Sequence, residues 1–270
     1  MGRHAGKGGN NRLMFIPGLV SITFRQLTPA QIVSLVAQAG LNAIEWGGDV
    51  HAPHGDLAAA RALRHMTADG GLKVAAYGSY YRVSHADTGP FEDVLESAVE
   101  LGAPSIRVWA GRQGSAEADE TYWAQVVEDS RHIAELGAAA GVRIDYEFHN
   151  KTLTDTNEAA VKLLTQVAHD NLKCYWQPPR YSALDYNLSG LDAVQPWLQN
   201  VHAFTWHRVT GERCALADGA DDWRRYLDKI AAATPDEMNR LVLLEFVQDD
   251  EPENFVRDAQ TLRSWLAVYS

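Results

Sequence analysis

Short apolar runs alternate with longer amphipathic stretches along the chain. Residues 19–24, 43–46, 73–77, 105–109, 142–150, 172–177, 201–206 and 241–247 have the pattern of buried strands. Helical periodicity follows each run, over about residues 28–40, 56–69, 91–101, 119–140, 154–168, 188–198, 221–233 and 252–268. Thr28 and Pro29 open the first helix as a capping residue followed by a first-turn proline. The pattern predicts strands and helices in strict alternation.

Eight strand–helix units predict a closed (β/α)8 TIM barrel with a single domain. A doubly wound open sheet is the alternative, but Gly47-Gly48 after the second strand does not complete a dinucleotide fingerprint. We therefore expect no nucleotide or flavin. The barrel is assigned to residues 13–270. Residues 1–12 carry positive charge without an apolar segment, so we expect a disordered N-terminal tail rather than a signal peptide.

Composition narrows the classes of function. The net charge is −11 and the basic residues are scattered, whereas a nucleic-acid surface needs clustered lysine and arginine. There is no run of 18 apolar residues, so we expect no membrane span. Cys174 and Cys214 are too few for a disulfide framework and match no zinc motif. These features favour a cytoplasmic protein that binds neither nucleic acid nor membrane.

A barrel of this kind carries its active site at the carboxyl ends of its strands. Strands five to eight bring four polar side chains there: Glu147, Gln177, His202 and Glu245. An acidic residue at the end of a buried strand is costly to desolvate unless it is paired or binds a cation. This mainly oxygen set predicts a divalent metal, Mn²⁺ first, with Mg²⁺ or Co²⁺ as alternatives. Taken singly, His202 is also explained by a barrel hydrogen bond, and Gln177 by a polar network.

Other polar and aromatic side chains near this rim are candidates for substrate binding: His54, Arg107, Trp109, His149 and Trp46. Arg107 lies in a buried strand, where it can pair with Glu147 or hold a substrate carboxylate or phosphate. Glu45 shares the inward side of its strand if Ile44 and Trp46 face the helices. The tryptophans can stack on a sugar ring or simply pack the rim.

Segments 40–46 (GLNAIEW), 146–149 (YEFH), 175–178 (YWQP), 200–204 (NVHAF) and 243–247 (LLEFV) carry a family resemblance. They resemble the xylose isomerase-like TIM barrels, and more narrowly the bacterial sugar phosphate isomerase/epimerase group, from about Pro17 to Leu266. The resemblance implies a metal held by Glu, Asp, His and Glu. Gln177 stands where the family usually has aspartate. Arg180 replaces a histidine usually found three residues later, and we expect it to contact an anionic or hydroxyl-rich substrate.

The resemblance also implies a reaction. We expect a metal-dependent isomerase or epimerase of a sugar or related polyhydroxy carbonyl compound, with Glu147 and Glu245 transferring a proton through a metal-stabilised cis-enediolate. A lyase or dehydratase acting on an oxidised sugar, glycoside or cyclic polyol is the alternative, because a leaving group diverts the same intermediate. A metal-free sugar-binding barrel or partner subunit is the second alternative, which the Gln177 departure favours. The expected ligand is a small carbohydrate, and a homo-oligomer remains open.

Overall fold

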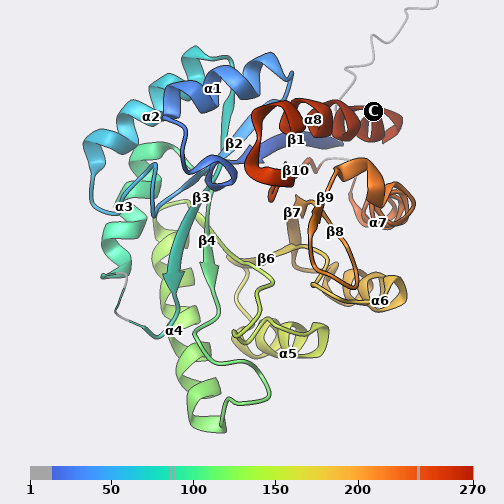
Figure 1. Cartoon of the computed structure of the whole chain (residues 1–270). Coiled ribbons are helices and arrows are strands. Elements are labelled where there is room, and N and C mark those ends of the chain that lie inside the picture. The colour runs from blue at the N-terminus through green and yellow to red at the C-terminus, as the bar shows by residue number, and fades with distance from the viewer. Residues whose placement is uncertain (1–13, 86, 88, 236–237, 270) are drawn as a thin grey trace, which may run out of the picture.

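The computed structural model of the chain describes residues 14–85, 87, 89–235 and 238–269. Eight parallel strands close into a barrel in the order β1-β10-β7-β6-β5-β4-β3-β2 (Figure 1). They are β1 (Phe15–Val20), β2 (Ala43–Gly47), β3 (Lys73–Arg82), β4 (Ser105–Trp109), β5 (Arg143–Tyr146), β6 (Leu172–Trp176), β7 (Leu198–Ala203) and β10 (Arg240–Leu244). The predicted (β/α)8 barrel is confirmed. The tail predicted over residues 1–12 lies outside the described residues.

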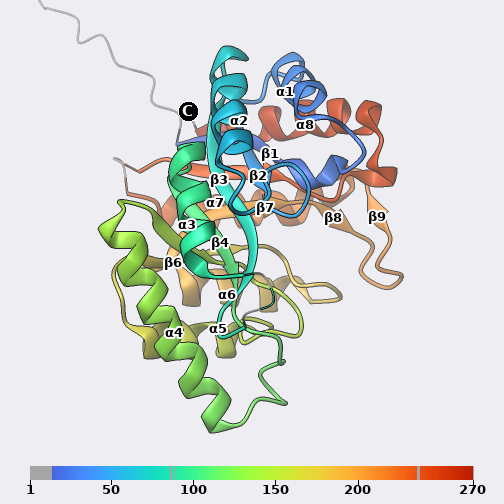
Figure 2. The same ribbon diagram turned by 90° about the vertical axis from the view of Figure 1, so that its left-hand side faces the viewer.

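Helices cover the outside of the barrel. They are α1 (Pro29–Gln38), α2 (Leu57–Asp69), α3 (Phe91–Leu101), α4 (Glu120–Ala139), α5 (Asn157–Val167), α6 (Leu184–Val194), α7 (Ala220–Ala233) and α8 (Pro252–Leu266). Short 3-10 helices are η1 (Ser21–Phe24), η3 (Leu216–Gly219), η4 (Gln248–Asp250) and η5 (Ala267–Tyr269). Figure 2 shows α2 and α3 side by side against β3. Among the described residues, no helix is long and apolar enough to cross a membrane.

Some predicted boundaries are wrong. The first strand is Phe15–Val20 instead of 19–24, and the four residues after it form η1. All four residues of η1 are buried. The apolar pattern of this segment therefore indicated burial correctly but did not distinguish a strand from a 3-10 helix. The sixth helix ends at Val194 instead of 198, because Leu198 already begins β7. Residues 205–206, expected to end strand seven, form β8 (Thr205–Trp206) and pair with β9 (Arg213–Cys214) in an antiparallel hairpin.

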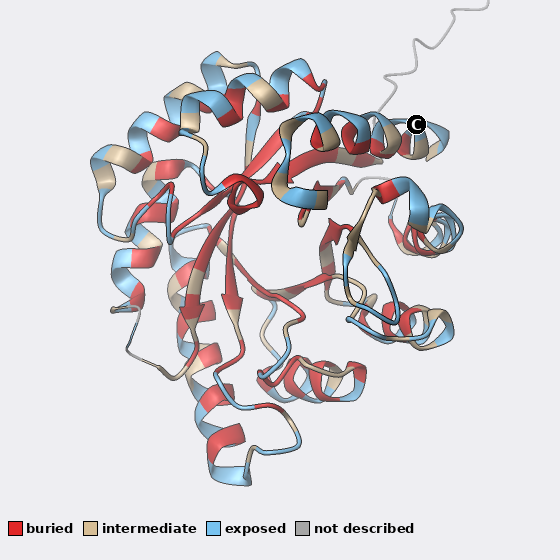
Figure 3. Cartoon of the chain, in the orientation of Figure 1, coloured by how far each residue is buried: buried red, intermediate tan, exposed pale blue. Residues whose placement is uncertain are grey.

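Apolar side chains pack in two layers. A small cluster fills the barrel interior: Val20, Ile22, Ala43, Ala75, Ala76, Tyr175 and Leu243. A larger cluster lies between strands and helices, and the buried residues in Figure 3 follow the strands and the inner helix faces. The interior is tight at Gly18 of β1, where a Cβ would lie 2.5 Å from the Ala43 carbonyl oxygen. Because the interior is filled, a ligand finds space only at the rim.

The predicted cap of α1 is present and offers a test of the fold. The Thr28 side chain accepts from the Gln31 backbone N–H, and the Gln31 side chain accepts from the Thr28 N–H at 2.8 Å. Thr28→Ala should lower the free energy of unfolding by about 1 kcal/mol, because a helix-end N–H loses its partner. Thr28→Ser keeps the hydroxyl and should stay within about 0.5 kcal/mol of the parent. Urea unfolding measures both, and equal stability of the two variants would contradict the cap.

Candidate active site

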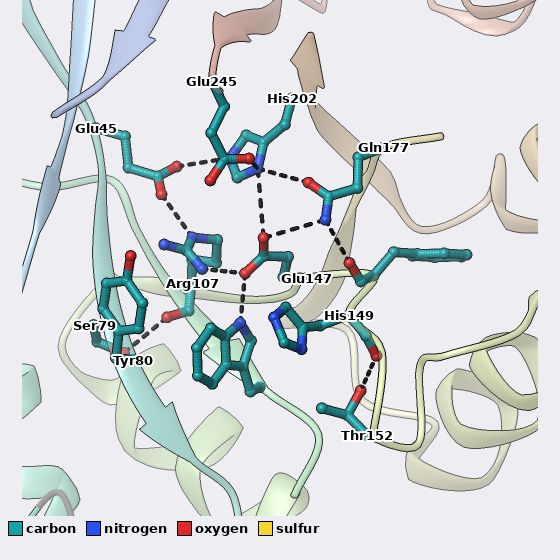
Figure 4. Close-up of polar contacts among 12 residues, drawn as sticks. Glu45, Ser79, Tyr80, Arg107, Glu147, His149, Thr152, Gln177, His202 and Glu245 are labelled. Atoms are coloured by element: carbon teal, nitrogen blue, oxygen red, sulfur yellow. Dashed lines mark hydrogen bonds and ion pairs between the residues drawn. The ribbon is translucent and has the colours of Figure 1, made fainter. Parts of the chain in front are cut away.

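The ends of four neighbouring strands converge on one buried point. Glu147, Gln177 and Glu245 directly follow β5, β6 and β10, and His202 lies within β7. From His202 Nδ1, the distances are 3.1 Å to Gln177 Oε1, 3.2 Å to Glu245 Oε2 and 3.6 Å to Glu147 Oε1. Figure 4 shows the four side chains pointing toward one another. The structure thus brings together the residues that the sequence proposed as metal ligands.

The geometry of this group fits a divalent ion. One ligand atom each from Glu147, His202 and Glu245 lies within 4.8 Å of the others, and all three residues are buried. Metal bonds of about 2.1 Å place neighbouring ligand atoms about 3 Å apart, close to the observed spacing. Within the described part of the chain, no hydrogen bond reaches Glu245 Oε2, although the atom is buried. A cation at this point would satisfy that oxygen, and the mainly oxygen donors suit Mg²⁺ or Mn²⁺.

Gln177 can join this set through its oxygen. Its Nε2 donates to the Phe148 carbonyl at 2.7 Å and approaches Glu147 Oε1 at 3.4 Å. Because a carbonyl only accepts, this contact fixes the amide orientation and turns Oε1 toward His202. The glutamine therefore supplies an uncharged oxygen where the resemblance implied a carboxylate.

Arg107 lies between two buried glutamates, as Figure 4 shows. Its Nε donates to Glu45 Oε1 at 2.6 Å, and its Nη1 donates to Glu147 Oε2. Gly78 on β3 leaves room for it, since a Cβ there would lie 2.7 Å from Arg107 Nη2. Burial raises the pKa of Glu147, but Arg107 and then His202 outweigh burial and hold that pKa below its ordinary value. Glu147 is therefore a carboxylate at neutral pH.

Aromatic rings complete the wall beside Glu147. Trp109 Nε1 donates to Glu147 Oε2 at 2.5 Å, and the His149 ring lies 4.4 Å from the Trp109 ring. The site opens into a cavity of about 310 Å³. Its lining residues include Arg25, Tyr80, Arg107, Trp109, Glu147, His149, Gln177, Arg213, Glu245 and Phe246.

Three proposed substrate-binding residues lie elsewhere. Trp46 is fully buried and donates from Nε1 to Thr67 on α2, so it faces the helices and not the cavity. His54 Nε2 lies 2.6 Å from the Ser79 carbonyl oxygen, away from the cavity lining. Arg180 stacks on Trp206, 3.6 Å from the ring centre, and lines an adjoining cavity of about 580 Å³.

Sequence reasoning missed several residues that line the cavity. Arg25, Tyr80, Arg213 and Phe246 reach it from segments that follow or extend strand ends. Tyr80 and Phe246 adopt positive φ angles of 58° and 52°, which are strained for non-glycine residues and common at functional sites. No periodic pattern encodes such conformations. A partial signal was available in the position of Phe246 directly after Glu245.

Sequence similarity identifies the family of this chain. The xylose isomerase-like TIM barrel family matches residues 33–265, so the chain belongs to this family. A curated relative, the 3-dehydroshikimate dehydratase of Bacillus anthracis, is 28% identical over 203 residues, which make up 68% of this chain and 69% of the relative.

Two solved structures show the same fold. The probable 3-DHS dehydratase AsbF of Bacillus anthracis, involved in petrobactin synthesis, has a TM-score of 0.73 at 20% identity, covering 93% of this chain and 99% of that chain. A D-psicose 3-epimerase in the presence of D-fructose has a TM-score of 0.63 at 16% identity, covering 94% and 97%. The named relatives are therefore enzymes of two reaction classes.

Gln177→Glu tests the ligand set. The variant keeps the side-chain length and adds a charge beside His202, so it should bind Mn²⁺ roughly tenfold more tightly than the parent. Without metal it should be less stable, because a carboxylate cannot donate to the Phe148 carbonyl. Glu245→Gln is the matched change in the opposite direction and should weaken Mn²⁺ binding. Calorimetric titration measures both, and unchanged affinity of Gln177→Glu would place residue 177 outside the ligand set.

His202 generates a pH dependence of metal binding. Burial lowers its pKa, but Glu245, Glu45 and Glu147 outweigh burial and raise the pKa well above its ordinary value. Without metal the imidazole is therefore protonated at neutral pH, and it must lose that proton to ligate. Mn²⁺ affinity should rise about tenfold per pH unit below this pKa and level off above it. Calorimetric titrations in buffers of different ionisation enthalpy measure how many protons are released when Mn²⁺ binds. Binding at neutral pH without proton release would exclude His202 as a ligand.

Proposed function

We propose that this protein is a divalent-metal-dependent dehydratase of a cyclic hydroxy ketone that carries a carboxylate, with 3-dehydroshikimate as the candidate substrate. The observation that carries the proposal is the buried group of Glu147, His202 and Glu245 at the base of a cavity that also contains Arg25 and Arg213. Guanidinium groups beside a metal site favour an anionic substrate over a neutral sugar. The 28% identity to a 3-dehydroshikimate dehydratase supports the same choice.

The two glutamates differ in their capacity to accept a proton. Glu147 accepts hydrogen bonds from Arg107, Trp109 and Gln177, which stabilise its charged form. Glu245 also lines the cavity, and its Oε2 has no hydrogen-bond partner among the described residues, although His202 Nδ1 approaches it at 3.2 Å. Glu245 is therefore the better general base in this proposal. A divalent ion bound here would polarise the substrate carbonyl as a Lewis acid.

In the proposed dehydration, Glu245 acts as the general base and His149 as the general acid. Glu245 takes a proton from the carbon next to the carbonyl, and the electron pair of that C–H bond forms a carbon–carbon double bond as the β-hydroxyl leaves. His149 Nδ1 donates to the Asn150 carbonyl oxygen at 2.7 Å, so Nε2 is the ring nitrogen left to exchange a proton. His149 lines the cavity and is proposed to protonate the departing hydroxyl, which leaves as water.

Epimerisation of a ketose is the second candidate, because it begins with the same proton removal. It needs a second group that returns a proton to the opposite face of the carbon. If the second glutamate, Glu147, is that group, its three hydrogen-bond donors oppose its protonation. This asymmetry favours the dehydratase.

The proposed function predicts a measurable reaction. With Mn²⁺ the protein should convert 3-dehydroshikimate into an aromatic dihydroxybenzoate, detected by its ultraviolet absorbance. Glu245→Gln should lower kcat by about 10²- to 10⁴-fold with the metal still bound, because the general base is lost. Metal occupancy of each variant is the control. Exchange of carbon-bound hydrogen of D-psicose with D₂O, without turnover of 3-dehydroshikimate, would instead establish the epimerase.

A further inference from the structure

Three arginines line the reaction cavity, but two of them are already held by protein partners. Arg107 uses Nε and Nη1 on Glu45 and Glu147, and its Nη2 packs against β3 at Gly78. This arginine is fully buried and serves the glutamates. Its Nη2 has no hydrogen-bond partner among the described residues, but this buried atom packs against Gly78 and offers a single donor instead of a paired edge.

Arg25 is occupied in a similar way. Its Nη1 donates to Asp49 Oδ2, and its Nη2 donates to the Tyr80 hydroxyl at 3.0 Å. Both terminal nitrogens of this guanidinium therefore have partners. Arg25 and Tyr80 form part of the cavity wall, and Arg213 is the third arginine in that wall.

Arg213 keeps one edge of its guanidinium available. Nη1 donates to Asp250 Oδ1, whereas Nε and Nη2 have no hydrogen-bond partner among the described residues. The group is half-buried and lies 5.2 Å from the centre of the Phe246 ring and 6.0 Å from that of Trp206. Asp250 and these rings fix its direction, so little side-chain freedom remains to be lost on binding.

The position of Arg213 also favours contact with a substrate. It lines both the 310 Å³ reaction cavity and the adjoining 580 Å³ cavity, together with His149, Gln177 and Phe246. It therefore lies where a substrate bound at the metal group would extend outward. Arg180 lines only the second of these cavities and packs its guanidinium on Trp206.

We propose that Arg213 binds the substrate carboxylate and is the residue that selects acidic hydroxy ketones over neutral sugars. The inference rests on the proposed function and deepens it. Nε and Nη2 form the side edge of the guanidinium, whose two parallel N–H groups match the two oxygens of a carboxylate. The Asp250 contact on the opposite side keeps this edge turned away from its own protein partner.

Two probes isolate the carboxylate contact. Calorimetry of the Mn²⁺-loaded protein with 3,4-dihydroxybenzoate and with catechol compares one ring with and without the carboxylate, since both present adjacent hydroxyls to the metal. The parent should bind the dihydroxybenzoate more tightly. Arg213→Gln should reduce this preference about 10- to 100-fold while leaving catechol binding unchanged. Arg213→Lys should restore part of it, because it keeps the charge without the paired donors.

Arg208→Gln is the matched control. Arg208 lies in the same hairpin, pairs with Asp222 and does not line the reaction cavity, so this variant should keep the full preference. A preference that survives in Arg213→Gln would overturn the assignment of Arg213 and leave the dehydratase standing. Failure of both probes to bind the Mn²⁺-loaded parent would overturn the proposed function and this inference together.

Discussion

The Arg107 guanidinium, held between Glu45 and Glu147, determines the net charge of the buried carboxylates around the candidate metal site. Three buried carboxylates, those of Glu45, Glu147 and Glu245, face this one permanent cation. Two negative charges remain, and a divalent ion matches them when the neighbouring imidazole is neutral. An aspartate in place of Gln177 would add a third negative charge, which would attract a divalent ion more strongly but leave the metal-free rim less stable. The amide at position 177 and the buried guanidinium therefore belong to one charge balance.

The same ion pair makes the two glutamates of the rim unequal. Glu147 is enclosed by donors on both oxygens, so its charge is stabilised and its affinity for a proton is reduced. Glu245 follows β10, three strands away around the barrel, and its Oε2 has no hydrogen-bond partner among the described residues. Two residues that look equivalent in the sequence thereby acquire different chemical capacities. The difference arises from contacts between strands that are distant in the chain.

The repeating strand and helix pattern was sufficient to predict the barrel, and strand alternation was sufficient to place the ligand candidates at the ends of strands five to eight. Strand alternation also accounts for the position of Trp46, which faces the helices because its neighbour Glu45 occupies the inward side. The cavity residues that sequence reasoning missed followed no such rule. Tyr80 and Phe246 reach the cavity through left-handed backbone conformations that only tertiary packing imposes. Arg213 depends on a hairpin whose residues were partly assigned to strand seven.

In that hairpin, β8 and β9, the His207 N–H donates to the Glu212 carbonyl oxygen at 2.8 Å, and Arg213 connects the hairpin to Asp250 of η4. The hairpin stands apart from the eight strands that hold the metal-site residues. A change of sequence in this hairpin therefore leaves the strand pairing of the barrel in place. Under the assignment of Arg213, a change of a few residues in this hairpin would alter which substrates bind, while Glu147, His202 and Glu245 keep their places on the barrel strands.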